Sequence, residues 1–411
     1  MNNKVINEHS AQNAINDGGH NMNNYVDEPS VAENISTISA ELSSTKRKAS
    51  FLSPLNQRRW KIFRNSKRGW WSLCIFITLC LISFFAEFIA NDRPIIASYK
   101  GHIMLPILYD YPDATFGGKL ANADFRDPTI QQEIKEHGWA IWPPIHYSYN
   151  TISPYNTALE PPFWLTTREE ACKLYPDGVH DSDCKFANLH LLGTDDQTRD
   201  IFTRVLYGFR VSIVFTILMT LFSSVIGIAA GAIQGYFGGK VDLIMQRVIE
   251  IWYSVPGLFL IIVMGSVFQQ GFWILLFILI FFQWIILVGL VRAEFFRARN
   301  FEYVTAARAL GASNFSIMTR HLLPNAMVAA MTYLPFLLTS GISILTSLDY
   351  LGFGLPPGSA SLGEIIRQAT RALNAPWIAI TVFVTVALML SLLAFIGEAV
   401  RGAFDPRKTF Q

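Results

Sequence analysis

Residues 251–291 read IWYSVPGLFLIIVMGSVFQQGFWILLFILIFFQWIILVGLV and contain no Asp, Glu, Lys or Arg. As one helix this stretch would extend roughly 60 Å, about twice the thickness of the hydrocarbon core of a bilayer. The polar sequence QQG at 269–271 interrupts it near the middle. We therefore predict two consecutive transmembrane helices joined by a short turn at 269–271.

Four more apolar stretches lie on either side of this run. They occupy residues 69–90, 211–239, 322–348 and 372–397. Only 16% of the 411 residues are charged, whereas soluble domains carry about 25% charged residues. We therefore predict an all-α membrane protein with six transmembrane helices in contact with the lipid bilayer.

The distribution of basic residues predicts the orientation of these helices. Six crossings place the following segments on one side of the membrane: 58–68, 240–250, 292–324 and the residues after 400. These segments are basic, whereas the short loops on the other side hold only Arg367 and Arg371 as basic residues. Because Lys and Arg collect in short cytoplasmic loops, we predict that both termini are cytoplasmic.

The remaining polar segments divide the chain into domains. Residues 1–57 are poor in aromatic residues and predict a disordered cytoplasmic tail. Residues 58–90 form a basic flank and the first span, and the flank is expected at the membrane surface, not on nucleic acid. The polar segment 91–205 is expected outside the membrane as a periplasmic lobe. A five-helix core at 206–401 and a second cytoplasmic tail at 402–411 complete the chain.

Few residues point to chemistry within the chain. Cys172 and Cys184 lie in the exterior segment, where an oxidising compartment would allow a disulfide, and free thiols remain the alternative. The stretch GYFGGKVD at 235–242 lacks the glycine spacing and the Ser or Thr of a phosphate-binding loop. No metal-ligand spacing occurs. We therefore expect no catalytic residues, no metal and no cofactor in this chain.

The joint between the fourth and fifth spans reads EYVTAARALGASNFSIMTRHLLPN at 302–325. Its first half predicts a helix with Glu302, Ala306 and Ala309 or Leu310 on one stripe and a patch of small side chains at Thr305, Ala306 and Ala307. Gly311 is suited to the left-handed conformation that ends a helix, and Ser313 or Asn314 can cap a second helix. Pro324 suits the first turn of the fifth span. The joint therefore predicts a compact knob, and a helix lying on the lipid surface is the alternative.

Two further positions are candidates for the transport pathway. Asp349 precedes the stretch YLGFGLPPG, in which Gly352, Gly354 and Pro356 prevent a regular helix. Irregular backbone at membrane depth occurs where it is buried in protein or lines a cavity. We expect this segment to form an outer gate or to contact a binding protein, with an exposed loop as the alternative. Gln283 is the candidate pore-lining residue, although a hydrogen bond between helices would also explain it.

The joint at 302–325 resembles the cytoplasmic "EAA" loop of bacterial ABC-importer permeases. Ala306, Ala307, Gly311, Leu323 and Pro324 match the family pattern. Thr305 stands where the family has glutamate, and His321 stands where it has isoleucine. In that family the loop is the coupling helix that inserts into a cleft on the ATPase subunit. The resemblance therefore implies an ATPase-coupling role for Glu302, Thr305, Ala306, Ala307, Gly311, His321 and Pro324.

Other stretches carry the same resemblance over about 190–408. HLLGTDDQTRD at 190–200 resembles a signature of the dipeptide and oligopeptide branch, with Thr198 in place of its glycine. The matches at 235–260 and 347–363 are of the same kind, and the likeness is greatest to the C-type permease subunit of the Yej type. That branch imports peptides, including the peptide-nucleotide antibiotic microcin C.

The resemblance implies the type I ABC-importer permease fold in a bacterial inner membrane. It also implies alternating access with three kinds of partner: a homologous second permease subunit, ABC ATPase subunits that bind ATP and Mg²⁺, and a periplasmic peptide-binding protein.

Three alternatives remain at this point. A permease of the same branch could carry a non-peptide substrate such as nickel or a sugar. A secondary carrier or channel would be a different class, but it requires a charged residue inside a span, and none is visible in the interiors of the predicted spans. A membrane-anchored enzyme would have to use the exterior segment, which shows no nucleophile or metal spacing.

Overall fold

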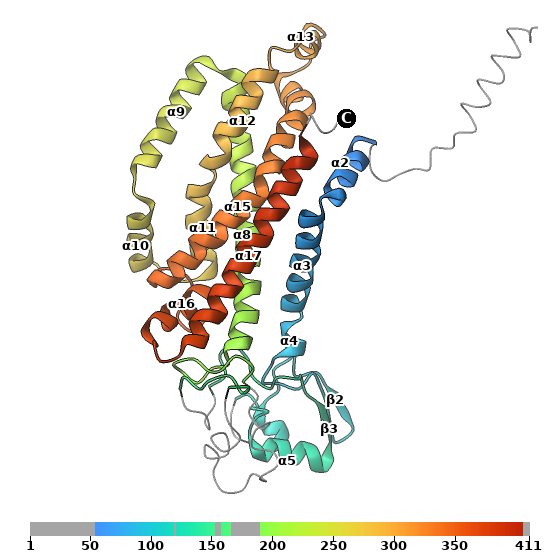
Figure 1. Cartoon of the computed structure of the whole chain (residues 1–411), viewed down its shortest axis with the longest axis vertical. Helices are drawn as coiled ribbons and strands as arrows, with labels where there is room; N and C mark the ends of the chain where they lie inside the picture. The colour runs from blue at the N-terminus through green and yellow to red at the C-terminus, as the bar shows by residue number, and fades with distance from the viewer. Residues whose placement is uncertain (1–53, 119–120, 153–157, 166–189, 406–411) are drawn as a thin grey trace, which may run out of the picture. The chain divides into compact units, whose positions relative to one another are not determined.

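The computed structural model describes residues 54–118, 121–152, 158–165 and 190–405 (Figure 1). Nearly all of the predicted N-terminal tail lies outside these residues. Cys172 and Cys184 also lie outside them, so the disulfide stays a prediction.

Five of the described helices are long and apolar enough to cross a membrane. They are α3 (Lys67–Phe84), α8 (Ile201–Phe237), α11 with α12 (Phe272–Gln283 and Ile285–Ala298), the continuous helix Asn314–Leu351, and α17 (Pro376–Phe404). The bent pair α9 (Gly239–Ser254) and α10 (Gly257–Val267) makes six spans if it counts as one. The helical membrane fold is therefore confirmed.

The bent pair differs from the predicted third span. We expected that span to begin at 251, but α9 already begins at Gly239 and contains the charged residues Lys240, Asp242, Arg247 and Glu250. The axis turns by 68° between Gly239–Ser254 and Gly257–Met264. Pro256 explains the bend, because a proline disfavours helical backbone at the preceding residue, and Val255 is extended with ψ 119°.

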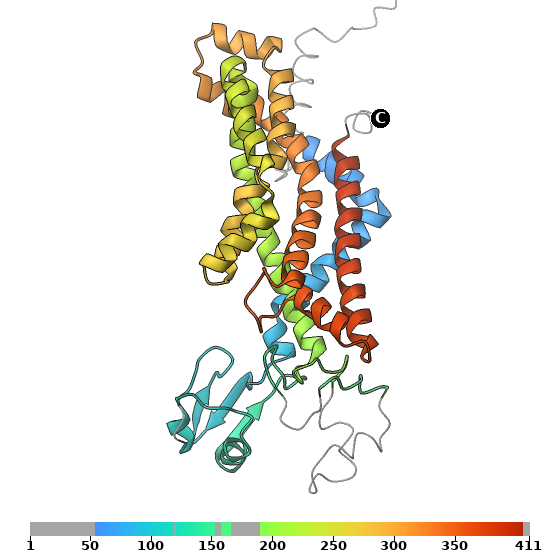
Figure 2. The same ribbon diagram turned by 90° about the vertical axis from the view of Figure 1, so that its left-hand side faces the viewer.

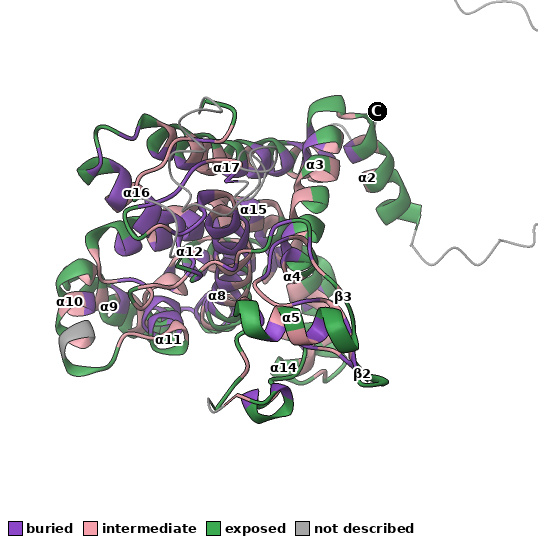
Figure 3. Cartoon of the chain, turned by 90° about the horizontal axis from the view of Figure 1, so that it is seen from below, coloured by how far each residue is buried: buried purple, intermediate pink, exposed green. Residues whose placement is uncertain are grey.

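Helix α8 lies in the middle of the bundle and packs along α12 (Figure 3). Gly227, Gly231 and Gly235 follow one another at intervals of four residues and face α12. A Cβ atom at Gly227 would lie 2.3 Å from the carbonyl oxygen of Trp284, and one at Gly235 would lie 2.6 Å from that of Arg292. Small residues on one face let two helices approach closely without lipid between them. These glycines therefore fix the distance between α8 and α12.

At one end of the bundle, three short elements form the predicted knob, which we define as residues 302–322 (Figures 1 and 2). It contains α13 (Glu302–Ala309), α14 (Asn314–Ser316) and the π-type turn η2 (Ile317–Leu322), and it continues directly into α15 (Leu323–Leu351). Beyond α15, the short helix α16 (Leu362–Arg371) precedes α17.

At the other end lies the lobe, made of the described residues between α3 and α8 (Figure 2). It contains a small antiparallel sheet in the order β2–β1–β3, so the chain is not entirely helical. The strands are β1 (Ile96–Tyr99), β2 (His102–Met104) and β3 (Gly138–Ile141), and Ala97 pairs with Met104 on one side and Ala140 on the other. The short helices α2 (Pro54–Asn65), α4 (Ala86–Ile89), η1 (Asp113–Phe116) and α5 (Pro128–His137) complete the description. Residues of α5 and β1 share one small core.

Candidate functional site

The knob has one buried face and one exposed face. Val304 of α13 is completely buried and packs with Ile317 and Leu322, which belong to the helix that becomes α15. The opposite face of α13 is exposed, and it carries Glu302, Thr305, Ala306 and Ala309, with Ala307 partly buried. One face of α13 therefore packs against the protein, and its opposite face is exposed.

The tip of the knob is a glycine turn flanked by two exposed apolar side chains. Gly311 has φ 80°, and its N–H donates to the carbonyl oxygen of Arg308 at 3.0 Å. The hydroxyl of Ser313 accepts from the N–H of Ser316 at 3.3 Å and so caps the next helix. Leu310 is 88% exposed and Phe315 is 76% exposed. Two large apolar side chains this exposed on a rigid turn form a surface suited to a partner protein.

The second half of the knob differs from the prediction of a separate helix ending before Pro324. The helix runs without a break from Asn314 to Leu351. Pro324 lies in the first turn of α15, and the wide turn η2 precedes it. A proline lacks the N–H that would bond one turn back, and a local π-type turn is a known way for a helix to continue past such a site. His321 lies in this turn and is half-buried.

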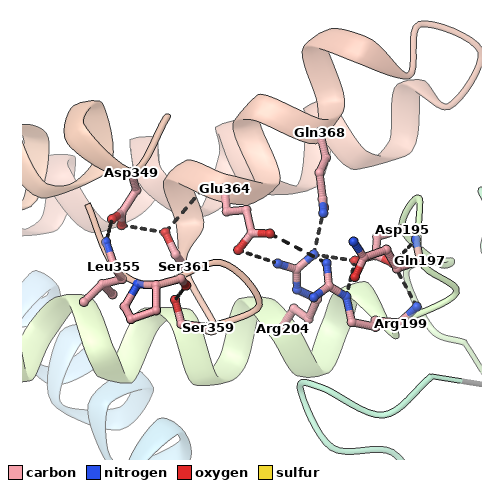
Figure 4. A network of polar contacts seen from close by, with 11 residues as sticks. Asp195, Gln197, Arg199, Arg204, Asp349, Leu355, Ser359, Ser361, Glu364 and Gln368 are labelled. Atoms are coloured by element: carbon pink, nitrogen blue, oxygen red, sulfur yellow. Dashed lines mark hydrogen bonds and ion pairs between the residues drawn. The ribbon is translucent and has the colours of Figure 1, made fainter. Parts of the chain in front are cut away.

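At the opposite end of α15, Asp349 organises the segment that follows. Its side chain accepts from the Leu355 N–H at 2.7 Å and from the Ser361 hydroxyl at 2.5 Å (Figure 4). Gly354 must be a glycine, because a Cβ there would lie 1.7 Å from Asp349 Oδ1. Gly352 ends α15 with φ 84°. Pro356 is half-buried, and the segment is packed against the bundle instead of forming an exposed loop.

A buried network of charges lies next to this segment (Figure 4). Asp195 accepts from Arg199 Nε at 2.8 Å and also from Arg204 NH1. Arg204, which is fully buried in the first turns of α8, donates to Gln368 Oε1 at 2.7 Å and lies 3.3 Å from Glu364 Oε2. Two arginines therefore face two carboxylates. The network therefore has no net charge. Charged side chains are tolerated in the interior of a protein when they are paired in this way.

A cavity of about 540 Å³ lies between α10, α11, α12 and α15 and is lined by Gln283. Aromatic and hydroxyl groups share the lining, including Trp252, Tyr253, Ser343 and Ser347. Within the described residues, Gln283 Nε2 is buried without a hydrogen-bond partner. The interhelical hydrogen bond that was the alternative explanation for Gln283 is therefore not formed through this donor.

The described residues contain no group of three or more His, Cys, Asp or Glu side chains that could hold a metal ion. His190 faces Asp200 at 2.8 Å in a buried pair, and Asp200 also caps α8 by accepting from the Thr203 N–H. These contacts fix the start of a helix.

Residues 223–410 match the family described as "Binding-protein-dependent transport system inner membrane component", and residues 53–110 match "N-terminal TM domain of oligopeptide transport permease C". The chain is 54% identical over 368 residues to "Peptidoglycan transport system permease protein YejE" of Agrobacterium fabrum, covering 89% of this chain and 97% of that protein. The chain belongs to this permease family.

Two further relatives agree with that assignment. The permease is 50% identical over 358 residues to "Inner membrane ABC transporter permease protein YejE" of Escherichia coli, with 87% of this chain and 98% of that protein covered. It is 35% identical over 225 residues to "Oligopeptide transport system permease protein OppC" of Lactococcus lactis, with 54% and 76% covered.

Sequence reasoning missed the charge network of the permease. The second span was predicted from 211, which left Arg204 in the exterior segment, whereas α8 begins at Ile201. A signal was present, because Asp200 immediately precedes an apolar run and Asp is a preferred N-cap residue. No signal in the sequence indicated that Glu364 and Gln368 of α16 would face Arg204.

Proposed function

We propose that this permease subunit imports peptides by alternating access and that its knob docks into a separate ABC ATPase. In this proposal the knob and both termini face the cytoplasm and the lobe faces the periplasm. The observation that carries it is the knob: its tip exposes Leu310 and Phe315, and Phe315 lies in the helix that continues without a break into a membrane span.

The continuous helix Asn314–Leu351 supplies a direct mechanical link. Its 38 residues correspond to roughly 57 Å of helix. One end of it carries Phe315, and the other end carries Asp349, which holds the segment 352–361. A displacement of the knob by ATP-driven closure of the ATPase would therefore reach the outer segment through one continuous helix, which contains Pro335 in its interior. This supports the roles proposed for Asp349, Gly352, Gly354 and Pro356 in an outer gate.

The remaining partners follow from the same proposal. ATP and Mg²⁺ would be bound by the ATPase and not by this chain. A homologous second permease would complete the passage, with Gln283 on its lining, and a periplasmic peptide-binding protein would deliver the substrate. The proposed coupling residues are Glu302, Thr305 and Ala306 on the exposed face, the partly buried Ala307, Gly311 in the turn, His321 in η2 and Pro324 in the first turn of α15. Glu302 lies on the same exposed face as Thr305 and would supply the carboxylate that the family carries one turn later.

Substitution of the tip tests the docking. Leu310→Asp should lower co-purification of the ATPase with the permease about thirty-fold, because loss of a central apolar contact in an interface costs about 2 kcal/mol or more. Leu373→Asp is the matched control, since Leu373 is 86% exposed between α16 and α17 at the far end of the bundle. ATPase recovery that is equal in the two variants would overturn the docking role.

A second variant tests the glycine turn at Gly311 instead of the apolar contact made by Leu310. Gly311→Val forces a β-branched residue into a left-handed backbone although no atom lies within 4 Å of the new Cβ. We expect ATP-dependent peptide uptake to fail while membrane insertion persists. Gly101→Val in the lobe has the same kind of backbone and open surroundings, with φ 82°, and should retain ATPase recovery. Normal uptake by Gly311→Val would contradict the coupling mechanism.

The substrate has one specific competitor. The relative that is 54% identical is named as a peptidoglycan transport permease, so peptide-bearing cell-wall fragments are the second candidate. The two candidates are separated by a competition assay, in which cell-wall fragments are added while ATP-dependent uptake of labelled free peptides into vesicles is measured. Inhibition by nickel or a sugar alone would instead favour the non-peptide alternative, and uptake driven by an ion gradient without ATP would favour a secondary carrier.

A further inference from the structure

A small polar pocket lies where the knob meets the ends of two transmembrane helices. It has a volume of about 400 Å³ and is lined by Tyr236 and Phe237 of α8, Arg299 and Asn300 after α12, Arg308 of α13 and Asn314 of α14. Its lining contains two guanidinium groups, two carboxamides and a phenol, but no carboxylate. Tyr236 donates its hydroxyl to Asn314 Oδ1 at 2.6 Å, so the pocket offers an anion its two guanidinium groups and its carboxamide N–H groups, with no carboxylate in the lining.

Arg299 and Arg308 differ from three nearby arginines that form ion pairs. Arg247, Arg292 and Arg297 each face a carboxylate at 2.5 to 2.6 Å. No ion pair is formed by Arg299 or Arg308 with any residue that the structure describes.

Aromatic rings and backbone hold both guanidinium groups in place instead. Arg299 lies over the Phe296 ring at 4.6 Å and donates weakly to the carbonyl oxygens of Gly235 and Tyr236, both at 3.4 Å. Arg308 lies over the Tyr236 ring at 5.9 Å. The ring contacts orient the two guanidinium groups. The carbonyl oxygens engage Nη1 of Arg299, so its Nε and Nη2 can face an anion.

The position of the pocket along α8 indicates where the anion comes from. Phe237, the last residue of α8, lines the pocket and is 51% exposed. Ile233 and Ile226 lie four and eleven residues before it, which places all three on one side of the helix, and they are 40% and 44% exposed. An apolar stripe thus leads from the pocket along the span. A phospholipid whose headgroup fills the pocket would place its acyl chains on this stripe.

We propose that this pocket binds the phosphate of an anionic phospholipid headgroup through Arg299 and Arg308. Basic pockets at the membrane–water interface attract anionic headgroups, and arginine matches the geometry of phosphate oxygens. Because the pocket joins α8, α12, α13 and α14, the bound phosphate would hold the knob against the ends of the two spans. The proposal requires only that α8 crosses the membrane, so it does not depend on the solute carried or on the docking of the ATPase.

Native mass spectrometry of the delipidated importer complex, titrated with phosphatidylglycerol, phosphatidylcholine or inorganic phosphate, tests the site. Wild type should bind phosphatidylglycerol more tightly than phosphatidylcholine. Arg299→Gln with Arg308→Gln should weaken phosphatidylglycerol binding about thirty-fold, because each basic side chain near an anionic surface contributes a factor of about five. Arg299→Lys with Arg308→Lys keeps both charges but loses the stacked guanidinium groups, so its affinity should lie between those of the glutamine variant and wild type, which shows that the substituted pocket is folded.

The matched control removes two charges elsewhere at the same end of the molecule. Arg247→Gln with Arg320→Gln changes the net charge equally, and both side chains are exposed. An equal loss of phosphatidylglycerol in this control would overturn the site, because the effect would then be one of total charge. Inorganic phosphate that binds as tightly as the lipid would identify a soluble anion and overturn the lipid assignment. If Arg299→Gln with Arg308→Gln bound lipid as wild type does but lost the ATPase, a carboxylate of the partner would be the group that occupies the pocket, and the lipid assignment would be wrong.

Discussion

At the scale of single residues, the signature at 190–200 forms a turn that is held by paired charges and by residues with left-handed backbone. Its charged residues Asp195 and Arg199 pair with each other, and its His190 and Asp200 form a second pair. Gly193 has φ 81°, and a Cβ there would lie 2.4 Å from the carbonyl oxygen of Glu160. Thr198 occupies the position where the signature of the dipeptide and oligopeptide branch has glycine. Its backbone has φ 62°. The turn therefore keeps the glycine-like conformation although the residue is threonine.

Thr198→Gly is expected to stabilise the protein. A left-handed backbone costs a residue with a Cβ about 1–2 kcal/mol, and the greater freedom of glycine in the unfolded chain offsets about 0.5–1 kcal/mol of that. We expect the free energy of unfolding to rise by about 0.5–1 kcal/mol, measured by thermal unfolding of the full chain in detergent. Thr198→Val, which keeps the branched side chain without the hydroxyl, should give no such gain, and equal gains in both variants would argue against relief of backbone strain.

At the scale of elements, the interface between α8 and α12 depends on three glycines that the apolar pattern alone did not single out. The sequence predicted two spans there, because the uncharged runs are long enough. It did not predict which spans would touch, since hydropathy carries no information about helix pairing. In the folded chain a Cβ atom at Gly231 would lie 2.8 Å from the carbonyl oxygen of Val288, so the two backbones meet closely at this point.

Gly231→Leu should disrupt this pair of helices. The new side chain would meet the α12 backbone and Val291, and overpacking of this kind costs about 1–3 kcal/mol. Gly289→Leu is the matched control on α12, because no atom lies within 4 Å of its Cβ position. The measurement is the temperature at which each variant loses resistance to trypsin in detergent. If both variants lost resistance at the same temperature, close packing of α8 on α12 would not be the cause.

At the scale of the whole molecule, Glu364 and Arg204 join segments that are far apart in the chain. Arg204 of α8 faces Asp195 of the preceding loop and Glu364 of α16, and Glu364 also lies near Arg199 (Figure 4). The network therefore fixes the start of α8 against the segment that Asp349 organises. It lies at the end of the bundle opposite the knob, where the proposed outer gate would move.

Removing one member of this network should be more harmful than removing a balanced pair. Glu364→Leu leaves a buried arginine without compensation, which costs about 3–5 kcal/mol. Glu364→Leu with Arg204→Leu leaves the Asp195–Arg199 pair neutral, so the double variant should unfold at a higher temperature than Glu364→Leu alone. Additive losses in the double variant would show that the two charges do not compensate each other.

The sequence by itself determined the approximate positions of the apolar spans, the turn at Gly311, a cap at Ser313 or Asn314, and the place of Pro324. These features depend on local properties, namely apolarity over the thickness of a bilayer and the backbone limits of glycine and proline. Only the tertiary structure decided which charges meet across α8 and α16, how the helix continues through η2, and that Arg299 and Arg308 converge on one pocket. Such contacts depend on the crossing and rotation of helices that are distant in sequence, and long-range packing sets these.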